Sequence, residues 1–329
     1  MKHLRLGICG FGAIGRLVLK LAVERGHEVV SVVDIDEKVV GKDAGEVAGI
    51  GRLGVNVSSS LAGLENADVV VHATGSYLDR VFDQVVSIIE RGVNVVSTSE
   101  TLAYPYYRYP VLAKKLDELA RMYGVVVIGT GINPGFLLDT LVVTLSSAVT
   151  SVKRIRAVRS LDAAKRREPF RKKIGLGEDP ELVRQKLLKG EITGHVGYAE
   201  SVYLIAYAGD LELTRVEERQ SPVPAEETIE SAGIRVERGF NKGITGYGVG
   251  YIKDREVIRL EFHAYAGAPE YEEIVIEGKD YTTTWRSTGT PGDLGTVTVV
   301  LNVAEKAPYL PPGLRLMTEL LPFKIRFSV

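Results

Sequence analysis

The chain has 329 residues, of which 45% are hydrophobic, and its formal net charge is −1. This length predicts one large domain or two ordinary ones with a proper core. The near-neutral charge argues against nucleic acid or an anionic membrane as the main partner. The sequence contains no long uncharged apolar run, so we expect no membrane-spanning segment.

The single cysteine, Cys9, excludes an internal disulfide framework and fits a reducing cytoplasm. Cys9 lies in an apolar run and is interpreted as a core residue, because no base is placed beside it. The chain leads straight into that run, which is interpreted as a strand rather than as part of a signal peptide. These features together predict a cytoplasmic protein.

Three glycines near the N-terminus, Gly10, Gly12 and Gly15, have the spacing GxGxxG between an expected strand, Leu4–Cys9, and an expected helix, Ala13–Glu24. Gly10 permits a tight turn, Gly12 lets the backbone approach a pyrophosphate, and Gly15 lets the helix pack close to the strand. The free N–H groups at the start of the helix favour phosphate. We therefore predict that a dinucleotide is bound by Gly10, Phe11, Gly12, Ala13, Ile14 and Gly15.

A second expected strand, Glu28–Ile35, carries Asp34 near its end, 19 residues past Gly15. A carboxylate at this place accepts hydrogen bonds from the ribose hydroxyls of an adenosine and repels a 2′-phosphate. We therefore expect NAD as the preferred cofactor, with measurable use of NADP. The alternative interpretation is an ordinary glycine-rich turn followed by a surface aspartate.

Strands and helices alternate through the first 130 residues, which predicts an α/β fold with a doubly wound parallel sheet and helices on both faces. The further strands are expected at Ala67–Ala73, Val93–Ser97 and Val125–Ile128, and the further helices at Val39–Gly49, Tyr77–Glu90 and Tyr107–Tyr123. Ligands of such sheets bind beyond the carboxyl ends of the strands. We therefore expect cofactor contacts from the residues that follow two of these strands, namely Ala73, Thr74, Gly75 and Thr98.

The pattern changes after residue 150, where an alternating strand is expected at Lys153–Ser160 and a short helix at Glu181–Leu188. Residues 211–277 are typical of antiparallel strands joined by polar turns, such as Asn241–Gly243 and Lys253–Asp254. A last helix is expected at Thr296–Ala304. This pattern predicts a second domain of the α+β class.

Glu100 is the candidate for acid–base chemistry, because it follows the strand Val93–Ser97 on a loop at the carboxyl edge of the sheet. A carboxylate beside a nicotinamide can bind a cationic amine, take its proton, or return a proton to a departing hydroxyl. The alternative is a surface acid, or one that helps to cap the segment after Pro105.

Four residues are candidates for contact with the substrate. Asn133 can bond a substrate or a nicotinamide amide, although Asn133 and Pro134 can equally form a turn that starts the next helix. Tyr104 belongs to a tyrosine cluster that either walls a small pocket or packs beneath the loop. His195, in a glycine-flanked loop, either binds substrate or has a structural role. The histidines are scattered without metal-ligand spacing, so we expect no metal.

The basic run Lys165–Lys173 has the charge to bind a substrate carboxylate. Such runs are more often solvated faces or intersubunit ion pairs, and we favour that interpretation. The other loops at the expected binding edge carry no arginine, so we expect a substrate without a carboxylate.

Several motifs together resemble the 2,4-diaminopentanoate dehydrogenases and the related native amine dehydrogenases, almost from end to end. These motifs are Gly10–Gly15, Val40–Asp43, Ser97–Glu100 with Ala103–Pro105, Gly129–Phe136, Gly194–Gly197 with Glu200–Ser201, and Pro312–Leu314. The resemblance implies a fold similar to dihydrodipicolinate reductase. It implies a dinucleotide-binding Rossmann domain at residues 1–135, a substrate-binding and oligomerisation α+β domain at 136–291, and a segment at 292–329 that returns to the first domain.

The resemblance also implies an NAD(P)-dependent homodimer that deaminates a small amine oxidatively, or aminates a ketone or aldehyde with ammonia. In this family a glutamate after the fifth strand is thought to be catalytic, and Glu100 occupies that place, with Thr101 where many members carry a second acid. By loose analogy, Asn302 contacts the nicotinamide amide. Two alternatives remain: a reductase of a cyclic imine or another C=N substrate, and a dinucleotide-binding sensor without turnover.

Overall fold

The computed structural model describes residues 3–328 and divides the chain into two compact units. The first unit comprises the residues up to Phe136 together with Pro291–Leu320. The second comprises Leu137–Thr290 together with the residues from Leu321 onward. No helix within residues 3–328 is long and apolar enough to cross a membrane.

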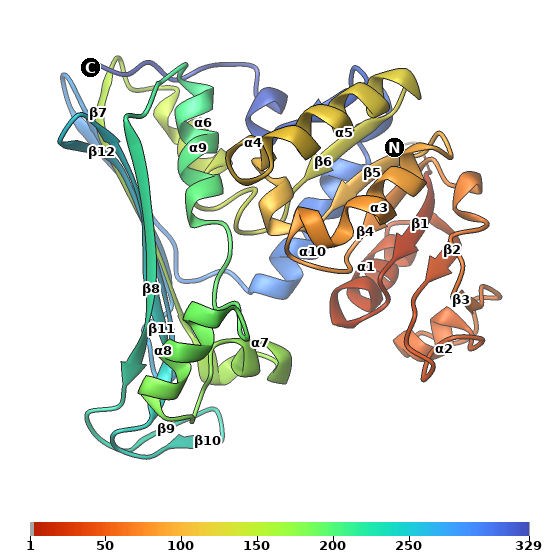
Figure 1. The fold of residues 1–329 in the computed structure, drawn as a ribbon, viewed down its shortest axis with the longest axis horizontal. Coiled ribbons are helices and arrows are strands. Elements are labelled where there is room, and N and C mark those ends of the chain that lie inside the picture. The colour runs from red at the N-terminus through yellow and green to blue at the C-terminus, as the bar shows by residue number, and fades with distance from the viewer. Residues whose placement is uncertain (1–2, 329) are drawn as a thin grey trace. The chain divides into compact units, whose positions relative to one another are not determined.

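A seven-stranded sheet, parallel throughout, forms the centre of the first unit (Figure 1). In spatial order its strands are β15 (Gly313–Arg315), β6 (Val126–Gly129), β5 (Asn94–Ser97), β4 (Val69–His72), β1 (Arg5–Cys9), β2 (Glu28–Val33) and β3 (Val57–Ser58). The central strands are buried along their whole length, which explains their continuous apolar runs. The doubly wound parallel sheet predicted from the alternation of elements is confirmed.

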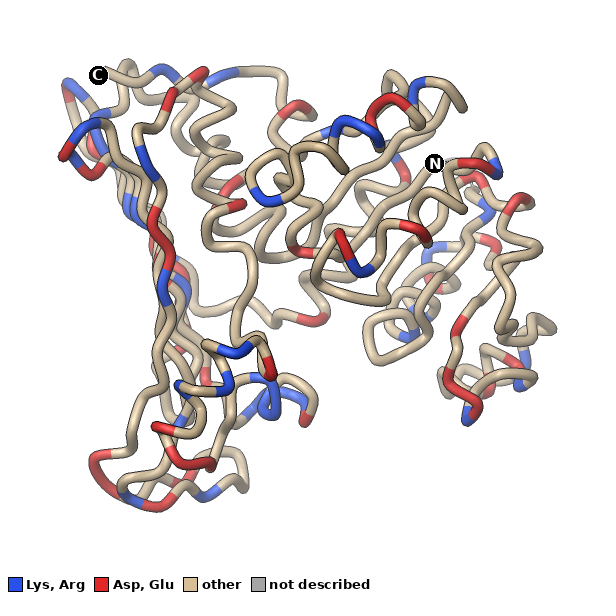
Figure 2. Tube along the Cα trace, viewed as in Figure 1, with Lys and Arg blue, Asp and Glu red and all other residues tan. Residues whose placement is uncertain are grey.

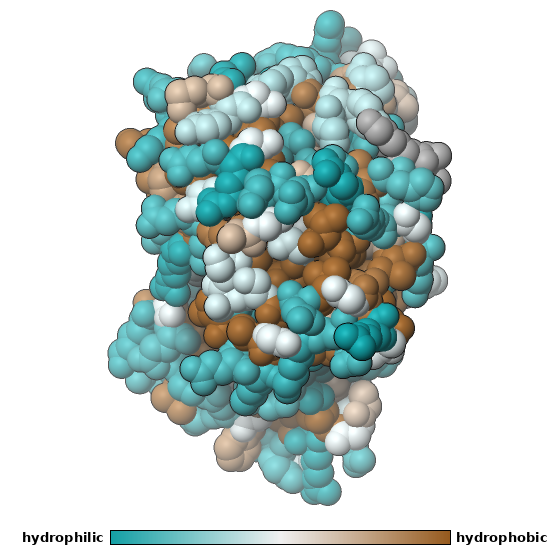
Figure 3. All heavy atoms as spheres, turned by 90° about the vertical axis from the view of Figure 1, so that its right-hand side faces the viewer, coloured by the Kyte–Doolittle hydropathy of each residue, from teal (hydrophilic) through white to brown (hydrophobic). Residues whose placement is uncertain are grey.

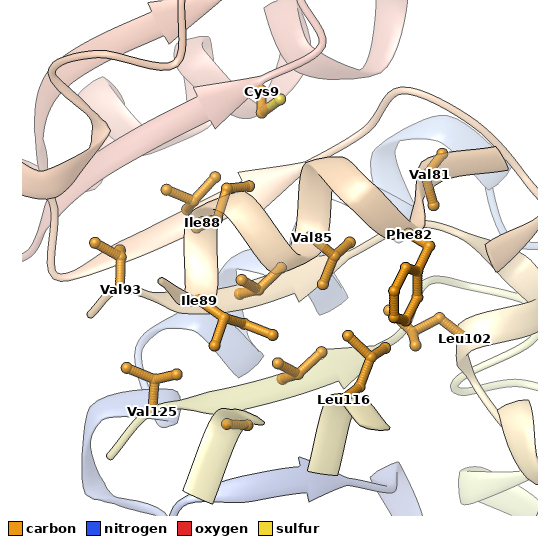
Figure 4. Close-up of a cluster of buried hydrophobic side chains, with 14 of the residues drawn as sticks. Cys9, Val81, Phe82, Val85, Ile88, Ile89, Val93, Leu102, Leu116 and Val125 are labelled. Carbon is orange, nitrogen blue, oxygen red and sulfur yellow. The ribbon is translucent and has the colours of Figure 1, made fainter. Parts of the chain in front are cut away.

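Helices cover both faces of this sheet (Figure 1). On one face α1 (Ala13–Glu24) packs against α10 (Gly292–Ala304), and on the other α3 (Leu78–Ile89) packs against α5 (Pro110–Met122). Side chains of α3 and α5, among them Leu116, form a buried apolar cluster over the strands (Figure 4). This packing holds the carboxyl ends of the strands, and therefore the loops that follow them, in fixed positions.

Two expected helices of the first unit differ from the structure. Instead of a helix at 39–49, a single turn, α2 (Ala44–Ala48), begins after Asp43, whose carboxylate accepts hydrogen bonds from four backbone N–H groups. The helix expected at 107–123 is divided into α4 (Pro105–Arg108) and α5. Pro110 causes the division, because it disfavours helical backbone at the residue before it and starts a new helix itself.

The second unit is built on a mixed six-stranded sheet (Figure 1). In spatial order its strands are β14 (Thr282–Arg286), β13 (Tyr271–Gly278), β7 (Val152–Asp162), β12 (Arg255–Tyr265), β11 (Asn241–Ile252) and β8 (Arg215–Pro224), and a separate hairpin is formed by β9 (Ile229–Ser231) and β10 (Ile234–Val236). Within residues 211–277 the strand pairs β8–β11 and β11–β12 are antiparallel, as expected. Strand β7, which lies outside this range, is inserted between β12 and β13 and runs parallel to β12.

The turn expected at Asn241–Gly243 is part of a strand in the structure. Asn241 begins β11 and is fully buried, with its amide donating to the carbonyls of Ile174 and Gly175 and accepting from Val223 and Gly243. A polar residue that satisfies all its hydrogen bonds can be buried without a large cost.

Four helices belong to the second unit, α6 (Thr140–Ser146), α7 (Glu168–Lys173), α8 (Pro180–Lys189) and α9 (Tyr198–Ala208). Helix α9 lies directly on β11, where a Cβ atom at Gly246 would stand 2.3 Å from the Tyr198 hydroxyl and one at Gly248 would stand 2.9 Å from the Tyr198 carbonyl oxygen. Glycines on this face of β11 therefore allow the close approach of the helix.

The segment expected to return to the first domain is shorter than predicted. It includes α10 and β15 but ends at Leu320. Beyond this point the chain pairs with β7. Val152 N–H donates to the Arg326 carbonyl at 2.7 Å, and the Val152 carbonyl accepts from Ser328 N–H at 2.9 Å. These backbone hydrogen bonds assign the last residues to the second unit.

Candidate active site

The glycine loop between β1 and α1 has the geometry that a dinucleotide requires. Gly10 has a φ of +96°, and a Cβ atom there would lie 2.6 Å from the Ala73 carbonyl oxygen. A Cβ atom at Gly15 would lie 2.1 Å from the Gly10 carbonyl oxygen, whereas one at Gly12 would meet no atom within 4 Å. No side chain caps α1. The open space at Gly12 and the uncapped N–H groups of α1 therefore fit a pyrophosphate.

Asp34 lies beside this loop. Its half-buried carboxylate accepts hydrogen bonds from Phe11 N–H at 2.5 Å and from Asp36 N–H at 2.9 Å. Arg16 approaches the loop from the first turns of α1 and donates through Nε to the Phe11 carbonyl at 3.1 Å. The carboxylate is thus held next to the glycine loop, where the ribose of a bound dinucleotide is expected.

The loops after β4, β5 and β6 leave the same edge of the sheet. Backbone hydrogen bonds continue the sheet one residue beyond each strand: Ala73 donates to Cys9 at 2.7 Å, Thr98 to His72 at 2.9 Å, and Thr130 to Ser97 at 2.8 Å. Ala73, Thr98 and the glycine loop are therefore close together, and Thr74 and Gly75 follow directly from Ala73.

Glu100 begins a single 3₁₀ turn, Glu100–Leu102, directly after β5. Its side chain is half-buried, and its carboxylate forms no hydrogen bond or ion pair with any residue between 3 and 328. The residues on either side are fixed: Ser99 Oγ donates to the Ser76 carbonyl at 3.0 Å, and Thr101 Oγ1 accepts from Leu78 N–H at 2.8 Å. The backbone that carries the acid is rigid while the acid itself is available for a ligand.

Gly129, the last residue of β6, supports the Glu100 turn from below. A Cβ atom at this position would lie 2.3 Å from the carbonyl carbon of Leu102 and 2.5 Å from Ala103 N. The turn therefore rests directly on the backbone of β6, a contact that only glycine permits.

The other first-unit candidates lie on nearby loops. Asn133 and Pro134 are in the loop after β6, and a cis peptide bond joins them. Thr130, in the same loop, has a buried hydroxyl without a hydrogen-bond partner among residues 3–328. Tyr104 follows the Glu100 turn and packs edge to face on Tyr106, with ring centroids 5.7 Å apart.

The structure does not bring Asn302 to this edge of the sheet, and that expectation is corrected. The Asn302 side chain accepts from Arg25 Nη1 at 2.9 Å, and Arg25 directly follows the last residue of α1, at the end away from the glycine loop. The residue of α10 that does approach the binding edge is Thr296, whose Oγ1 accepts from Ile132 N–H at 3.4 Å. Helix α10 runs antiparallel to the strands, so its first half, and not its last turn, lies near their carboxyl ends.

His195 belongs to the second unit and is half-buried there. Its ring lies 4.4 Å from the Phe262 ring and 4.7 Å from the Tyr198 ring, and its backbone N–H donates to Gln220 at 2.9 Å. Burial, together with the nearby charges of Lys173 and Arg159, holds the pKa of His195 well below its usual value. The imidazole is therefore neutral at physiological pH and does not supply a cation to an anionic substrate.

Charges of the basic run are partly compensated within the second unit. Lys165 forms an ion pair with Glu270, and Lys172 pairs with Glu168 at 2.7 Å, both on exposed surface. These contacts fit the interpretation of the run as a solvated charged face.

Sequence reasoning missed two buried charged or polar groups. Arg159, in the strand β7, forms a buried ion pair with Glu272 at 3.3 Å. His72, treated only as a strand residue, is fully buried at the end of β4, and burial lowers its pKa to about 4. In β4 the signal was a titratable residue among valines, and in β7 it was an arginine at the alternate positions that Ile155 and Ala157 occupy. Within residues 3–328 no group of three or more acidic, histidine or cysteine side chains is arranged to hold a metal ion.

Two family models match the chain. One, described as dihydrodipicolinate reductase, N-terminus, matches residues 4–102, and the other, described as 2,4-diaminopentanoate dehydrogenase C-terminal domain, matches residues 136–325. The chain is 29% identical over 339 residues to a 2,4-diaminopentanoate dehydrogenase of Acetoanaerobium sticklandii, covering 97% of this chain and 94% of the relative. It is 42% identical over 94 residues to a 4-hydroxy-tetrahydrodipicolinate reductase of Archaeoglobus fulgidus, covering 28% of this chain and 35% of the relative.

Solved structures confirm the expected fold. An amine dehydrogenase from Mycobacterium smegmatis is similar with a TM-score of 0.86 at 23% identity, over 99% of this chain and 98% of that chain. A dihydrodipicolinate reductase from Paenisporosarcina sp. is similar with a TM-score of 0.51 at 13% identity, over 97% and 100%. Since one family model spans more than half of its residues, the chain belongs to the family described as 2,4-diaminopentanoate dehydrogenase C-terminal domain.

Proposed function

We propose that the protein is an NAD(P)-dependent amine dehydrogenase that acts on the CH–NH₂ group of a small amine, with Glu100 as its acid and base. The observation that carries this proposal is the Glu100 carboxylate, which is half-buried and has no protein partner within residues 3–328, on a rigid turn at the dinucleotide edge of the sheet. The similarity to the Acetoanaerobium 2,4-diaminopentanoate dehydrogenase and to the Mycobacterium amine dehydrogenase supports the same reaction class.

The chain binds NAD(H) at the glycine loop. Its pyrophosphate lies at Gly12 and the first turn of α1, its adenosine ribose at Asp34, and its nicotinamide end near Ala73–Gly75 and Thr98. Ile35 follows Asp34 and is 87% exposed, so it offers an apolar surface for the adenine ring. Apolar side chains gather in the middle of the face seen from the side of β3 and α2 (Figure 3). When bound, the nicotinamide supplies the hydride in amination and accepts it in deamination.

Glu100 removes and donates the protons that the reaction requires. In the aminating direction its carboxylate binds ammonium and removes one proton, so that the nitrogen lone pair attacks the carbonyl carbon of the substrate. It then returns a proton to the hydroxyl of the resulting carbinolamine, which leaves as water and gives an iminium ion, the acceptor of the hydride. Deamination follows the same steps in reverse, with water attacking the iminium carbon.

Tyr104, Asn133 and Pro134 contact the substrate from the loops around Glu100. Each of these residues is neutral. This supports a substrate without a carboxylate, with ammonia as the co-substrate. A substrate contact by His195, in the second unit, stays a prediction.

The protein assembles as a homodimer through the face of the second sheet that lies opposite α9. No helix of the described part of the chain packs on this face (Figure 1). Basic and acidic residues alternate along the strands of the sheet (Figure 2). Arg156 pairs with Glu261 at 2.7 Å, and Arg286 pairs with Glu273 at 2.9 Å. Because both signs alternate across the face, a second copy related by a two-fold axis can meet it with opposite charges.

The test is NADH oxidation with a panel of small ketones and aldehydes, with and without ammonium. The proposal requires turnover that depends on both the carbonyl compound and ammonium, and a chiral or primary amine as product. Oxidation by cyclic imines alone, without ammonium, would instead make the protein a C=N reductase. NADH binding without turnover of any substrate would indicate a dinucleotide-binding sensor.

A further inference from the structure

A buried histidine lies between the cofactor loop and the loop of the catalytic acid. His72, the last residue of β4, is fully buried. Its Nδ1 lies 2.8 Å from Ser97 Oγ, and its Nε2 lies 3.0 Å from Gln84 Oε1 and 2.8 Å from Thr74 Oγ1. One imidazole therefore contacts residues from both neighbouring segments.

The hydrogen bonds around the ring fix its protonation. Ser97 Oγ accepts Ser99 N–H at 3.1 Å, so its own proton is free to donate to Nδ1 of His72. Thr74 Oγ1 donates to Gln84 Oε1 at 2.7 Å, so the Nε2 proton of His72 is shared between these two oxygens. With the Gln84 oxygen facing the ring, the neutral imidazole with its proton on Nε2 satisfies all of these groups. The low pKa of the buried ring, about 4, agrees with a neutral imidazole.

We propose that His72 is a positioning residue that sets two parts of the active site at once. Through Nδ1 it holds Ser97 and Ser99, the backbone that leads directly into Glu100. Through Nε2 it holds Thr74 in the loop expected at the nicotinamide. The inference rests on the proposed function, because it takes Glu100 as the acid and the loop at Thr74 as a cofactor contact.

The two ring nitrogens can be removed separately. The side-chain amide of His72→Asn reaches the place of Nδ1, so this variant keeps an oxygen acceptor for Ser97 and loses the contact with Thr74. The longer amide of His72→Gln reaches the place of Nε2, so it keeps a donor for Thr74 and Gln84 and loses the contact with Ser97. A residue that acts only by filling space would respond alike to both changes.

The experiment measures kcat for amination and the Kd of NADH, by fluorescence titration, in both variants. His72→Gln should lower kcat about tenfold to a hundredfold, the effect of a small displacement of a catalytic group, with Kd changed less than about twofold. His72→Asn should raise Kd about tenfold with a smaller fall in kcat. Ser97→Ala should reproduce His72→Gln, and the double variant should be no worse than either single one.

Val70→Ala is the matched control, because Val70 lies two residues earlier on the same strand and makes only apolar contacts in the buried cluster. This variant should lower thermal stability, and it should not change kcat and the Kd of NADH by different factors as the His72 variants do. The proposal would be overturned if both His72 variants changed kcat and the Kd of NADH by equal factors. It would also be overturned if Val70→Ala showed the effects expected of either His72 variant.

A second measurement keeps the inference separate from the proposed function. Nitrogen-15 NMR of labelled histidine should show His72 neutral and protonated at Nε2 at neutral pH, with its Nδ1 signal moved by Ser97→Ala. If the wild type showed no amination but this spectrum and the Kd effects held, the proposed function would fail and the positioning role at the cofactor loop would stand. A ring protonated at Nδ1 would overturn the hydrogen-bond assignment itself.

Discussion

Cofactor choice depends on a single carboxylate. Asp34 is held beside the glycine loop by two backbone N–H groups, and a 2′-phosphate would come close to it. At roughly 4 Å and an effective dielectric near 20, each pair of unit charges repels by about 4 kcal/mol before screening. Arg16 lies by the same loop and offsets part of this repulsion for NADP.

Asp34→Ala should therefore reduce the preference for NAD over NADP, because it removes the repulsion and the acceptor for the ribose hydroxyls together. Steady-state kcat/KM with both cofactors measures this ratio. Glu37→Ala, an exposed acid three residues further on, should leave the ratio unchanged. A wild type that prefers NADP at saturating substrate would contradict the assigned role of Asp34.

His72 predicts a dependence of stability on pH. Its pKa is about 4 in the folded protein against 6.5 for the ordinary group, because burial disfavours the charged ring. The folded state therefore keeps its full stability above about pH 6.5 and loses about 3 kcal/mol as the pH falls toward 4. Urea unfolding of the wild type and of His72→Gln should converge as the pH falls over this range. Parallel curves would show that His72 does not titrate as described.

At the level of elements, β6 and the turn that carries Glu100 form one unit, because Gly129 allows the turn to rest on the strand. Gly129→Ala would push the turn away from β6 and should lower kcat by about a hundredfold, since misplacement by about 1 Å has an effect of that size. NADH should still bind. The control is Gly124→Ala, two residues before β6, where the φ of +68° lowers stability but a Cβ atom meets open space and does not displace the Glu100 turn. Similar kcat values for the two variants would contradict this account.

Much of the first unit could be predicted from local patterns, whereas long-range pairing could not. The bounds of α1, Ala13–Glu24, agree with the expectation because the glycine spacing and the apolar period both indicate them. The insertion of β7 between β12 and β13 brings together segments about 100 residues apart, which no local pattern encodes. The position of Asn302 could not be predicted because the apolar pattern of α10 does not show which end of the helix meets the carboxyl edge of the sheet.

At the scale of the whole molecule, the proposed dimer makes the second sheet a shared surface. Val275 lies on the face opposite α9, beside Arg156 of β7 and Thr284 of β14. Val275→Asp should weaken the dimer, because it places a further carboxylate, which must lose its water, in the middle of the interface, while the monomer still folds. Sedimentation should show a wild type of twice 35.9 kDa and a lighter variant. A monomeric wild type would contradict the dimer.

The account depends most directly on Glu100, and one comparison tests it. Glu100→Gln keeps the size of the side chain and removes its ability to exchange a proton. In the assay with ammonium, a carbonyl substrate and NADH, this variant should bind NADH with unchanged Kd and lose at least about a hundredfold in kcat. Turnover by Glu100→Gln close to that of the wild type would contradict the central claim, because the acid–base step would then belong to another residue.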